Sequence, residues 1–223
     1  MIRALLTLAT CSMVPTLSAA QDVNYYAGVA FTSNYISNGV TQTQDGPAIQ
    51  PYFEVESQGF YAGIWASNVD LGNSDNAEID LYLGYRTGLF NDRLGIDIGY
   101  ARYFYNDSGD CCGELKFNAL YELVPDLGVE AYFAYDTEAE VLNSRATLAY
   151  KVNDQLALSG VWGKINNNRE YWHAGGSYAF NGSVSLDVRY HGSTAGDPGL
   201  VATLSFATSQ DTLRRLFGNQ AQR

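Results

Sequence analysis

Apolar and polar residues alternate along most of this chain, and residues 59–70, GFYAGIWASNVD, show the pattern clearly. In a β-strand, side chains two residues apart lie on the same face. One face of this segment would carry Phe60 and Ile64, whereas the other would carry Tyr61 and Trp65, which are large rings with polar atoms at their tips. The first face is apolar, and the second is neither a typical solvent surface nor a typical core.

The same alternation, interrupted by turn residues, predicts about twelve strands. They are expected at residues 23–32, 48–57, 60–69, 77–87, 94–104, 114–123, 127–135, 144–152, 156–164, 171–180, 183–191 and 199–207. Their lengths suit tilted strands that cross a bilayer, and an even strand number is typical of single-chain bacterial outer-membrane barrels. We therefore predict an all-β fold, a 12-stranded antiparallel transmembrane β-barrel of the bacterial outer membrane, formed by residues 21–207.

The connections between the predicted strands alternate strictly between short and long. The short ones are SQG, GLFNDR, VPD, NDQ and NG. The long, polar ones cover residues 33–47, 70–76, 106–113, 136–143, 165–170 and 192–198. Short periplasmic turns and longer external loops are typical of outer-membrane barrels, so both chain termini are expected in the periplasm.

The two faces of the predicted strands differ in charge. One parity carries no charged residue except Arg102 and Lys164 near strand ends, and the other carries acidic and basic side chains. A soluble barrel would place the apolar face inside, and a soluble periplasmic barrel or sandwich stays open as an alternative. Aromatic residues near the strand ends favour lipid outside, because such residues form girdles at membrane interfaces. The expected upper girdle is Phe31, Tyr35, Tyr100, Tyr135, Trp162, Trp172 and Tyr190, and the lower one is Phe60, Tyr85, Tyr121, Tyr150, Phe180 and Phe206.

The lumen is therefore expected to receive the charged parity together with several aromatic rings. The predicted pore-lining residues are Glu54, Glu56, Tyr61, Trp65, Asp80, Tyr82, Arg86, Asp97, Glu122, Glu130, Tyr132, Lys151, Asp187 and Arg189. Acids outnumber bases at this parity, which predicts a narrow, wet, electronegative channel that prefers cations. Acids and bases that pair across the lumen would instead plug the barrel, and this alternative stays open. Glu122 and Glu130 are expected to face each other across the VPD turn.

Two histidines are candidates for a site inside the barrel. A three-residue connection, residues 181–183, would set His173 directly opposite His191 on neighbouring strands. We predict a pH-responsive or metal-binding pair, and two unrelated wall residues are the alternative.

The sequence favours a channel over an enzyme. His173 and Ser177 share a predicted strand but lie four residues apart, which is too far for a nucleophile and its base. The sequence has no nucleophile elbow, metal-ligand motif or phosphate-binding loop. An outer-membrane lipid-modifying enzyme, or a non-conducting receptor or adhesin, remains the alternative function.

The chain ends carry features of export. Arg3, the apolar run of residues 4–8 and the small residues at 18–20 predict a signal peptide over residues 1–20. Phe206 is the terminal aromatic residue expected of such barrels, and residues 208–223 are predicted to be a periplasmic C-terminal tail.

Charge and cysteine content narrow the expected partners. The formal net charge of −11 argues against nucleic-acid binding, which needs a basic surface. The expected partners are outer-membrane lipid and lipopolysaccharide, small solutes and the outer-membrane assembly machinery, and no cofactor is expected. Arg102 and Lys164 fall on the outward parity, where they would touch lipopolysaccharide phosphates or extend to water. Cys111 and Cys112, expected in a loop, would form a vicinal disulfide in an oxidising compartment.

A motif of aromatic, small and polar residues lies within residues 33–70. It consists of Ser33, Tyr35, Gly39, Pro47, Gln50, Gly59, Tyr61, Gly63, Trp65, Ser67 and Asn68. With this motif the chain resembles the TorF family of exported proteobacterial porins, also called the Gcw_chp family, and the remaining sequence follows the family's hairpin rhythm more loosely. The resemblance implies an outer-membrane barrel and a porin, without naming the solute. Asn38 departs from the family, whose members often carry arginine before the glycine, so the resemblance does not imply attraction of anions here.

Overall fold

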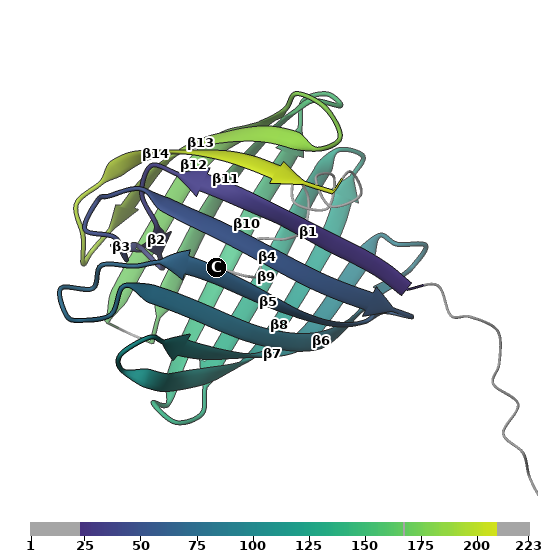
Figure 1. The fold of residues 1–223 in the computed structure, drawn as a ribbon. Helices are drawn as coiled ribbons and strands as arrows, with labels where there is room; N and C mark the ends of the chain where they lie inside the picture. The colour runs from purple at the N-terminus through teal and green to yellow at the C-terminus, as the bar shows by residue number, and fades with distance from the viewer. Residues whose placement is uncertain (1–22, 167, 209–223) are drawn as a thin grey trace, which may run out of the picture.

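Residues 23–166 and 168–208, described by a computed structural model, form a closed antiparallel barrel of twelve strands (Figure 1). The barrel strands are β1 (Val23–Thr32), β4 (Ala48–Ser57), β5 (Phe60–Asn68), β6 (Ala77–Leu89), β7 (Leu94–Tyr105), β8 (Gly109–Val124), β9 (Leu127–Asp136), β10 (Val141–Lys151), β11 (Leu156–Ile165), β12 (Arg169–Ala179), β13 (Val184–Ser193) and β14 (Gly199–Ala207). Each barrel strand pairs with the barrel strands before and after it in the chain, and β1 pairs with β14 to close the ring. The predicted fold class is confirmed. The predicted signal peptide and, apart from Thr208, the predicted tail lie outside the described residues.

The first long connection, residues 33–47, is folded rather than extended, and we name it the mouth loop. It contains a small separate hairpin formed by β2 (Ile36–Ser37) and β3 (Val40–Thr41). Asn38 and Gly39 form its turn with positive φ angles of 49° and 79°. Asn-Gly favours such hairpin turns because both residues tolerate positive φ.

The largest difference from the predicted strand boundaries lies at the start of β8. The loop expected at residues 106–113 is shorter, because β8 already begins at Gly109. Tyr103 on β7 pairs with Cys112, whereas the next residue of β7 pairs with Asp110. Cys111 is therefore the extra residue of a β-bulge, and the cysteines lie in a strand rather than in a loop.

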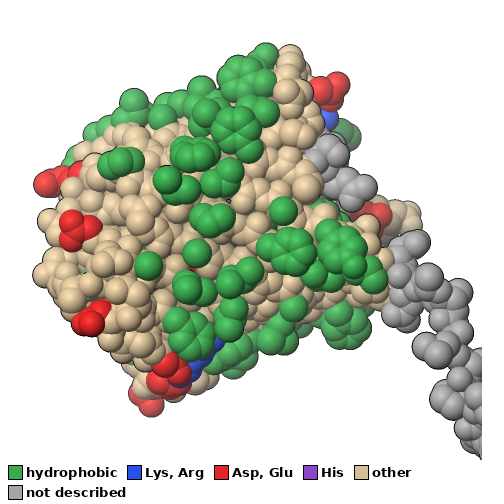
Figure 2. Space-filling view, viewed as in Figure 1, with side chains coloured by type: hydrophobic (Ala, Val, Ile, Leu, Met, Phe, Trp, Pro, Cys, Tyr) green, Lys and Arg blue, Asp and Glu red, His purple; other side chains and the backbone are tan. Residues whose placement is uncertain are grey.

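The apolar parity faces outward, as the alternation predicts. Phe60 and Leu200 are about two thirds exposed, and green apolar side chains cover the barrel wall in Figure 2, whereas the acidic side chains in that view lie toward the two ends. The opposite parity is enclosed, and Gln50 and Tyr132 are fully buried inside the barrel. An apolar outer surface with a polar interior is the arrangement of a barrel that spans lipid. Within the described parts of the chain, no helix is long and apolar enough to cross a bilayer.

The aromatic residues expected in the two girdles lie on the outer wall, with one exception. Twelve of the thirteen expected girdle residues are exposed or half-exposed on the outer wall. Tyr35 was placed wrongly, because only 6% of its surface is exposed. It belongs to the mouth loop, which turns it inward.

The pairing between the first and last strands is short. β1 pairs with β4 over ten residues, but with β14 over only five, from Gly28↔Ala207 to Thr32↔Thr203. The hydroxyl of Thr203 donates a hydrogen bond of 2.9 Å to that of Thr32 inside this junction. This strand pair closes the barrel next to the mouth loop.

Candidate functional site: the lumen and the loop across its mouth

The mouth loop is held by a network centred on Asn34. The Asn34 Oδ1 atom accepts hydrogen bonds from the hydroxyls of Thr41 (2.7 Å) and Thr43 (3.1 Å), and its Nδ2 donates to Asp45 (2.8 Å). The Thr43 hydroxyl also donates to the backbone carbonyl of Gly46 at 2.6 Å. Thr43 is 6% exposed, so the loop has a small polar core of its own.

The tip of the mouth loop reaches the far side of the barrel. Asn143 on β10 donates a hydrogen bond of 2.9 Å from Nδ2 to Asn38 Oδ1, and Tyr171 on β12 donates one of 2.8 Å to Asn143 Oδ1. β10 lies opposite β1 and β4, the strands from which the loop emerges. A Cβ added to Gly39 would lie 2.6 Å from the Cβ of Tyr171, so the tip is also packed against β12. The loop therefore crosses the mouth.

The residues that carry the family motif anchor this loop. The Tyr35 ring packs edge-on against Trp65 with 5.6 Å between centroids. The Asn68 side chain accepts a hydrogen bond from the Ile49 amide at 2.8 Å and donates to the Pro47 carbonyl at 3.0 Å. Burial, followed by the negative charges of Glu78 and Asp80, raises the pKa of the Tyr35 phenol well above its usual value. The motif thus specifies a loop and its attachment.

Four lumenal tyrosines lie against the wall instead of extending across the lumen. Each of the four lies opposite a glycine in the register: Tyr52↔Gly28, Tyr61↔Gly84, Tyr82↔Gly63 and Tyr171↔Gly163. A Cβ added to any of these glycines would overlap the ring of its partner tyrosine. The missing Cβ atoms give the rings room to lie flat, which leaves space at the centre of the barrel.

Four basic side chains inside the barrel are bonded to carboxylates. Arg86 lies 2.6 Å from Glu54 and 3.5 Å from Glu56, and its guanidinium stacks 3.9 Å from the centroid of the Tyr61 ring. Three further pairs are Arg145–Glu130 at 3.2 Å, Arg189–Asp187 at 2.6 Å and Lys116–Glu114 at 3.7 Å. A buried charge needs an oppositely charged partner, because its removal from water is costly. These pairs run along the wall, between residues of one strand or of nearby strands.

One region of the lumen combines acidic, basic and aromatic side chains. A cavity there is lined by Tyr61, Trp65, Asp80, Tyr82, Arg86, Asp97 and Lys116, among others. The Tyr61 hydroxyl donates to Asp97 at 2.6 Å, whereas the Oδ1 atom of Asp80 is buried without a hydrogen-bond partner. Glu78 lies two residues from Asp80 on the same face of β6 and accepts a bond of 3.1 Å from Tyr105.

His173 and His191 lie side by side in the register expected from the length of the turn. Their rings are 4.9 Å apart, and Arg189 Nη1 lies 2.9 Å from His173 Nδ1. Because arginine only donates, Nδ1 of this ring must accept. Ser177 donates to Asp187, which leaves it bonded to a carboxylate instead of to a histidine. In the described residues no group of three His, Cys, Asp or Glu side chains is arranged to hold a metal.

Two predicted lining residues lie at the rim. Glu122 is exposed near the end of β8, and Lys151, the last residue of β10, pairs with Asp154 at 2.9 Å. Glu122 and Glu130 do not face each other, because Glu122 pairs with Gly128 and Glu130 pairs with Leu120. This expectation was wrong, since it placed the hairpin register two residues away from the observed one.

Several lumenal residues were missed by the sequence analysis. The main ones are Asn34, Gln50, Asn118, Asp136 and Asn143. Parity alone would have placed Gln50, Asn118, Asp136 and Asn143 inside, but uncharged or strand-terminal residues gave no reason to select them. The contact between Asn143 and Asn38 has no local signal, because the two lie 105 residues apart.

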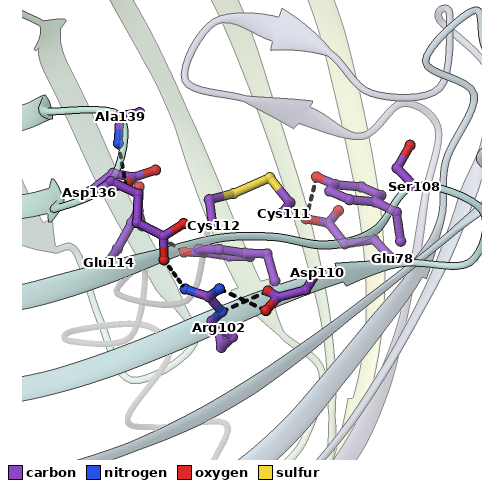
Figure 3. The surroundings of a disulfide bond; sticks show 12 residues. Glu78, Arg102, Ser108, Asp110, Cys111, Cys112, Glu114, Asp136 and Ala139 are labelled. Atoms are coloured by element: carbon purple, nitrogen blue, oxygen red, sulfur yellow. Dashed lines mark hydrogen bonds and ion pairs between the residues drawn. A yellow bond between two sulfur atoms is a disulfide. The ribbon is translucent and has the colours of Figure 1, made fainter.

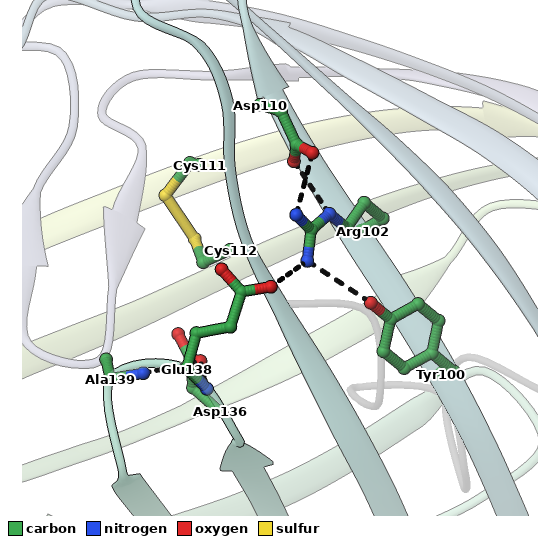
Figure 4. Close-up of polar contacts among 8 residues, drawn as sticks. All are labelled: Tyr100, Arg102, Asp110, Cys111, Cys112, Asp136, Glu138 and Ala139. Atoms are coloured by element: carbon green, nitrogen blue, oxygen red, sulfur yellow. Dashed lines mark hydrogen bonds and ion pairs between the residues drawn. A yellow bond between two sulfur atoms is a disulfide. The ribbon is translucent and has the colours of Figure 1, made fainter.

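The vicinal disulfide between Cys111 and Cys112 is present, beside Asp110 and Arg102 (Figure 3). Arg102 donates hydrogen bonds of 2.7 Å to Asp110 and 2.5 Å to Glu138, so it links β7, β8 and the loop after β9 (Figure 4). A guanidinium already bonded to two carboxylates is less available to an external phosphate. The predicted contact with lipopolysaccharide therefore remains a prediction.

Asp75 joins two neighbouring loops at the same end of the barrel. Its carboxylate accepts hydrogen bonds of 2.9 Å from the amides of Asp107 and Ser108 and one from the Ser108 hydroxyl. These bonds, the Ser108 hydroxyl foremost, lower the pKa of the Asp75 carboxyl below its usual value.

Comparison with known proteins agrees with this geometry. The KdgM porin superposes with a TM-score of 0.64 at 9% identity, covering 82% of this chain and 98% of that chain. A second KdgM structure, in complex with disordered oligogalacturonate, gives the same TM-score at 10% identity and the same coverage. The NanC porin reaches 0.50 at 10% identity, again with 82% and 98% covered. At these identities the similarity establishes the fold, which is that of small outer-membrane porins.

No curated protein matches the sequence significantly. The family model Gcw_chp, described as a bacterial protein of unknown function, matches residues 17–212. This match spans the whole barrel, including the mouth loop and its anchoring residues. The chain therefore belongs to the Gcw_chp family, whose motif builds the loop across the mouth of the barrel.

Proposed function

We propose that this protein is an outer-membrane channel for the passive diffusion of small solutes. The observation that carries the proposal is the enclosure of charged side chains by a barrel whose outer face is apolar. The similarity in fold to the KdgM and NanC porins supports it. The tyrosines that lie flat over glycines support an open lumen over a plugged one, because they keep large rings away from the centre.

The charge of the lumen supports a preference for cations. Among the described residues, eight carboxyl groups face inward between the strand ends: Glu54, Glu56, Glu78, Asp80, Asp97, Glu114, Glu130 and Asp187. Four basic side chains face them: Arg86, Lys116, Arg145 and Arg189. A lumen with this imbalance attracts cations and repels anions.

The solutes are therefore expected to differ from the ligand of one structural relative. The KdgM porin has been crystallised with oligogalacturonate, which is a polyanion. An acid-rich lumen disfavours a polyanion, so we propose neutral or cationic small solutes for this chain. The mouth loop limits their size, because it is bonded to both sides of the mouth.

We further propose that the mouth loop faces the cell exterior and that both termini face the periplasm. The alternation of short turns at one barrel end with longer loops at the other supports this orientation. A lipid-modifying enzyme has less support, because Ser177 is bonded to Asp187 instead of to an imidazole.

Conductance of the purified barrel in planar bilayers tests the proposal. Discrete single-channel steps are expected, with a reversal potential under a salt gradient that indicates cation preference. A barrel that inserts without producing steps would contradict the channel, whereas anion selectivity would contradict the charge argument alone.

A further inference from the structure

Asp80 is a lumenal carboxyl group that no basic side chain of the described residues pairs with. Its side chain is only 7% exposed, and its Oδ1 atom has no hydrogen-bond partner. Burial without a partner disfavours the ionised form of a carboxyl group, and a cation bound beside Asp80 would stabilise that form.

The nearby bases are engaged elsewhere. Arg86 is bonded to Glu54 and Glu56, and Lys116 lies 3.7 Å from Glu114. The cavity lining holds two carboxyl groups, Asp80 and Asp97, together with these two bases, but both bases are already bonded to carboxylates outside the lining. A cation is therefore the complementary group for Asp80.

The cavity walls add a second reason for a cation. Trp65 lies directly opposite Asp80 in the register, and Tyr82 lies two residues further along the same face of β6. Aromatic faces attract cations such as ammonium and guanidinium groups.

We propose that this cavity is a binding site for the ammonium or guanidinium group of a small organic cation, with Asp80 as its counter-ion and Trp65 and Tyr82 as its aromatic walls. The inference rests on the proposed function in that the cation would be a solute on its way through the channel. It goes beyond that function by naming a resident site and the chemical class that occupies it.

Fluorescence of Trp65 in the folded full-length barrel provides a test that needs no conductance. The chain has three tryptophans, so Trp162→Phe and Trp172→Phe, both on the outer wall, leave Trp65 as the reporter. Guanidinium chloride and urea at millimolar concentration and constant ionic strength are the matched probes, because urea is the neutral analogue of guanidinium. Saturable change with guanidinium and none with urea is expected.

Asp80→Asn should weaken guanidinium binding about tenfold or more, because the charged partner is lost. Asp126→Asn is the control, since it makes the same chemical change at an exposed turn whose positive φ asparagine also tolerates. Equal responses to guanidinium and urea, or an unchanged affinity in Asp80→Asn, would overturn the site. Should Asp80→Asn fail to fold, the comparison of guanidinium with urea on unaltered Asp80 still decides.

The outcomes separate this site from the channel. Guanidinium binding in a barrel that gives no conductance would overturn the proposed function and retain the site. Cation-selective conductance without guanidinium binding would overturn the site and retain the function. A neutral sugar that changes Trp65 emission as strongly as guanidinium would overturn the assignment to cations.

Discussion

Asn143 on β10 donates a hydrogen bond of 2.9 Å to Asn38, which lies at the tip of a loop that leaves the opposite side of the barrel. With the contact between Tyr35 and Trp65, this bond attaches the mouth loop at both ends of its span. The size and the charge of the passage at this level therefore depend on a few loop residues.

Replacing Gly39 with alanine is expected to displace the hairpin tip and to raise single-channel conductance. A Cβ there would lie 2.6 Å from the Cβ of Tyr171, and φ is +79°. Gly72→Ala is the matched control, because φ is +77° but the nearest side-chain atom lies 3.7 Å away. Equal conductance in both variants would show that the tip does not limit the passage.

Replacing Asn38 with arginine is expected to reduce the cation preference several-fold, because it places a positive charge at the tip of the loop that crosses the mouth. The measurement is the reversal potential under a salt gradient. Asn38→Asp, which tolerates the same positive φ, should shift that potential in the opposite direction. Shifts of the same sign in both variants would indicate that they act by moving the loop.

The connection between the loops at Asp75 is expected to persist in mild acid. Because the pKa of this carboxyl is lowered, its bonds stabilise the loop pair at pH values above the usual aspartate range of about 4, and this contribution is lost as pH falls through the lowered value. The protection factors of the Asp107 and Ser108 amides against hydrogen exchange should stay high at pH 5 and fall only below pH 4. Asp75→Asn should make both low throughout, and high protection in that variant would contradict the role of the carboxylate.

Acidification is expected to rearrange the histidine pair. Protonation would convert His173 Nδ1 from an acceptor to a donor and would place a positive charge beside Arg189. Conductance and selectivity should therefore change on acidification. The change should disappear in His173→Gln and be reduced in His191→Gln; its persistence in both would assign it to other groups. Zinc that leaves both imidazole NMR signals unchanged would end the predicted metal role.

Removal of the disulfide by Cys111→Ser together with Cys112→Ser is expected to lower the free energy of unfolding by only about 1 kcal/mol, because the bond closes a very short loop. Conductance should not change, since Cys111 is exposed and lies outside the cavity lining. Urea unfolding of the refolded barrel measures the first effect. A much larger loss would mean that the bulge at Cys111 depends on the disulfide.

The sequence predicted the barrel well because the pattern that determines a barrel is local. Alternate residues of each strand show which face points inward and which outward, as in residues 59–70. Short turns fix the register, as for His173 and His191. Two kinds of feature escaped this reasoning. Irregular pairing misplaced Glu122 and Glu130, and the bulge at Cys111 moved the cysteines into a strand.

The mouth loop escaped for a different reason. Its residues are of types that favour turns. Whether a loop extends into solvent or folds inward, however, depends on partners distant in sequence. Asn38 contacts Asn143 of β10, and Tyr35 contacts Trp65 of β5. The alternation of apolar and polar residues does not predict these contacts. The family motif marked the residues concerned without indicating their arrangement.

The junction of β1 with β14 has a consequence for assembly. Its five residue pairs join parts of the chain that are far apart in sequence, whereas each hairpin forms from adjacent segments. Among the described residues this junction has fewer residue pairs than any other strand pair of the barrel, so less backbone hydrogen bonding offsets the loss of chain entropy on joining the two ends. We expect the pairing of β1 with β14 to form last during insertion and to be lost first under denaturing conditions. The barrel would then open between its terminal strands into a curved sheet before its hairpins separate.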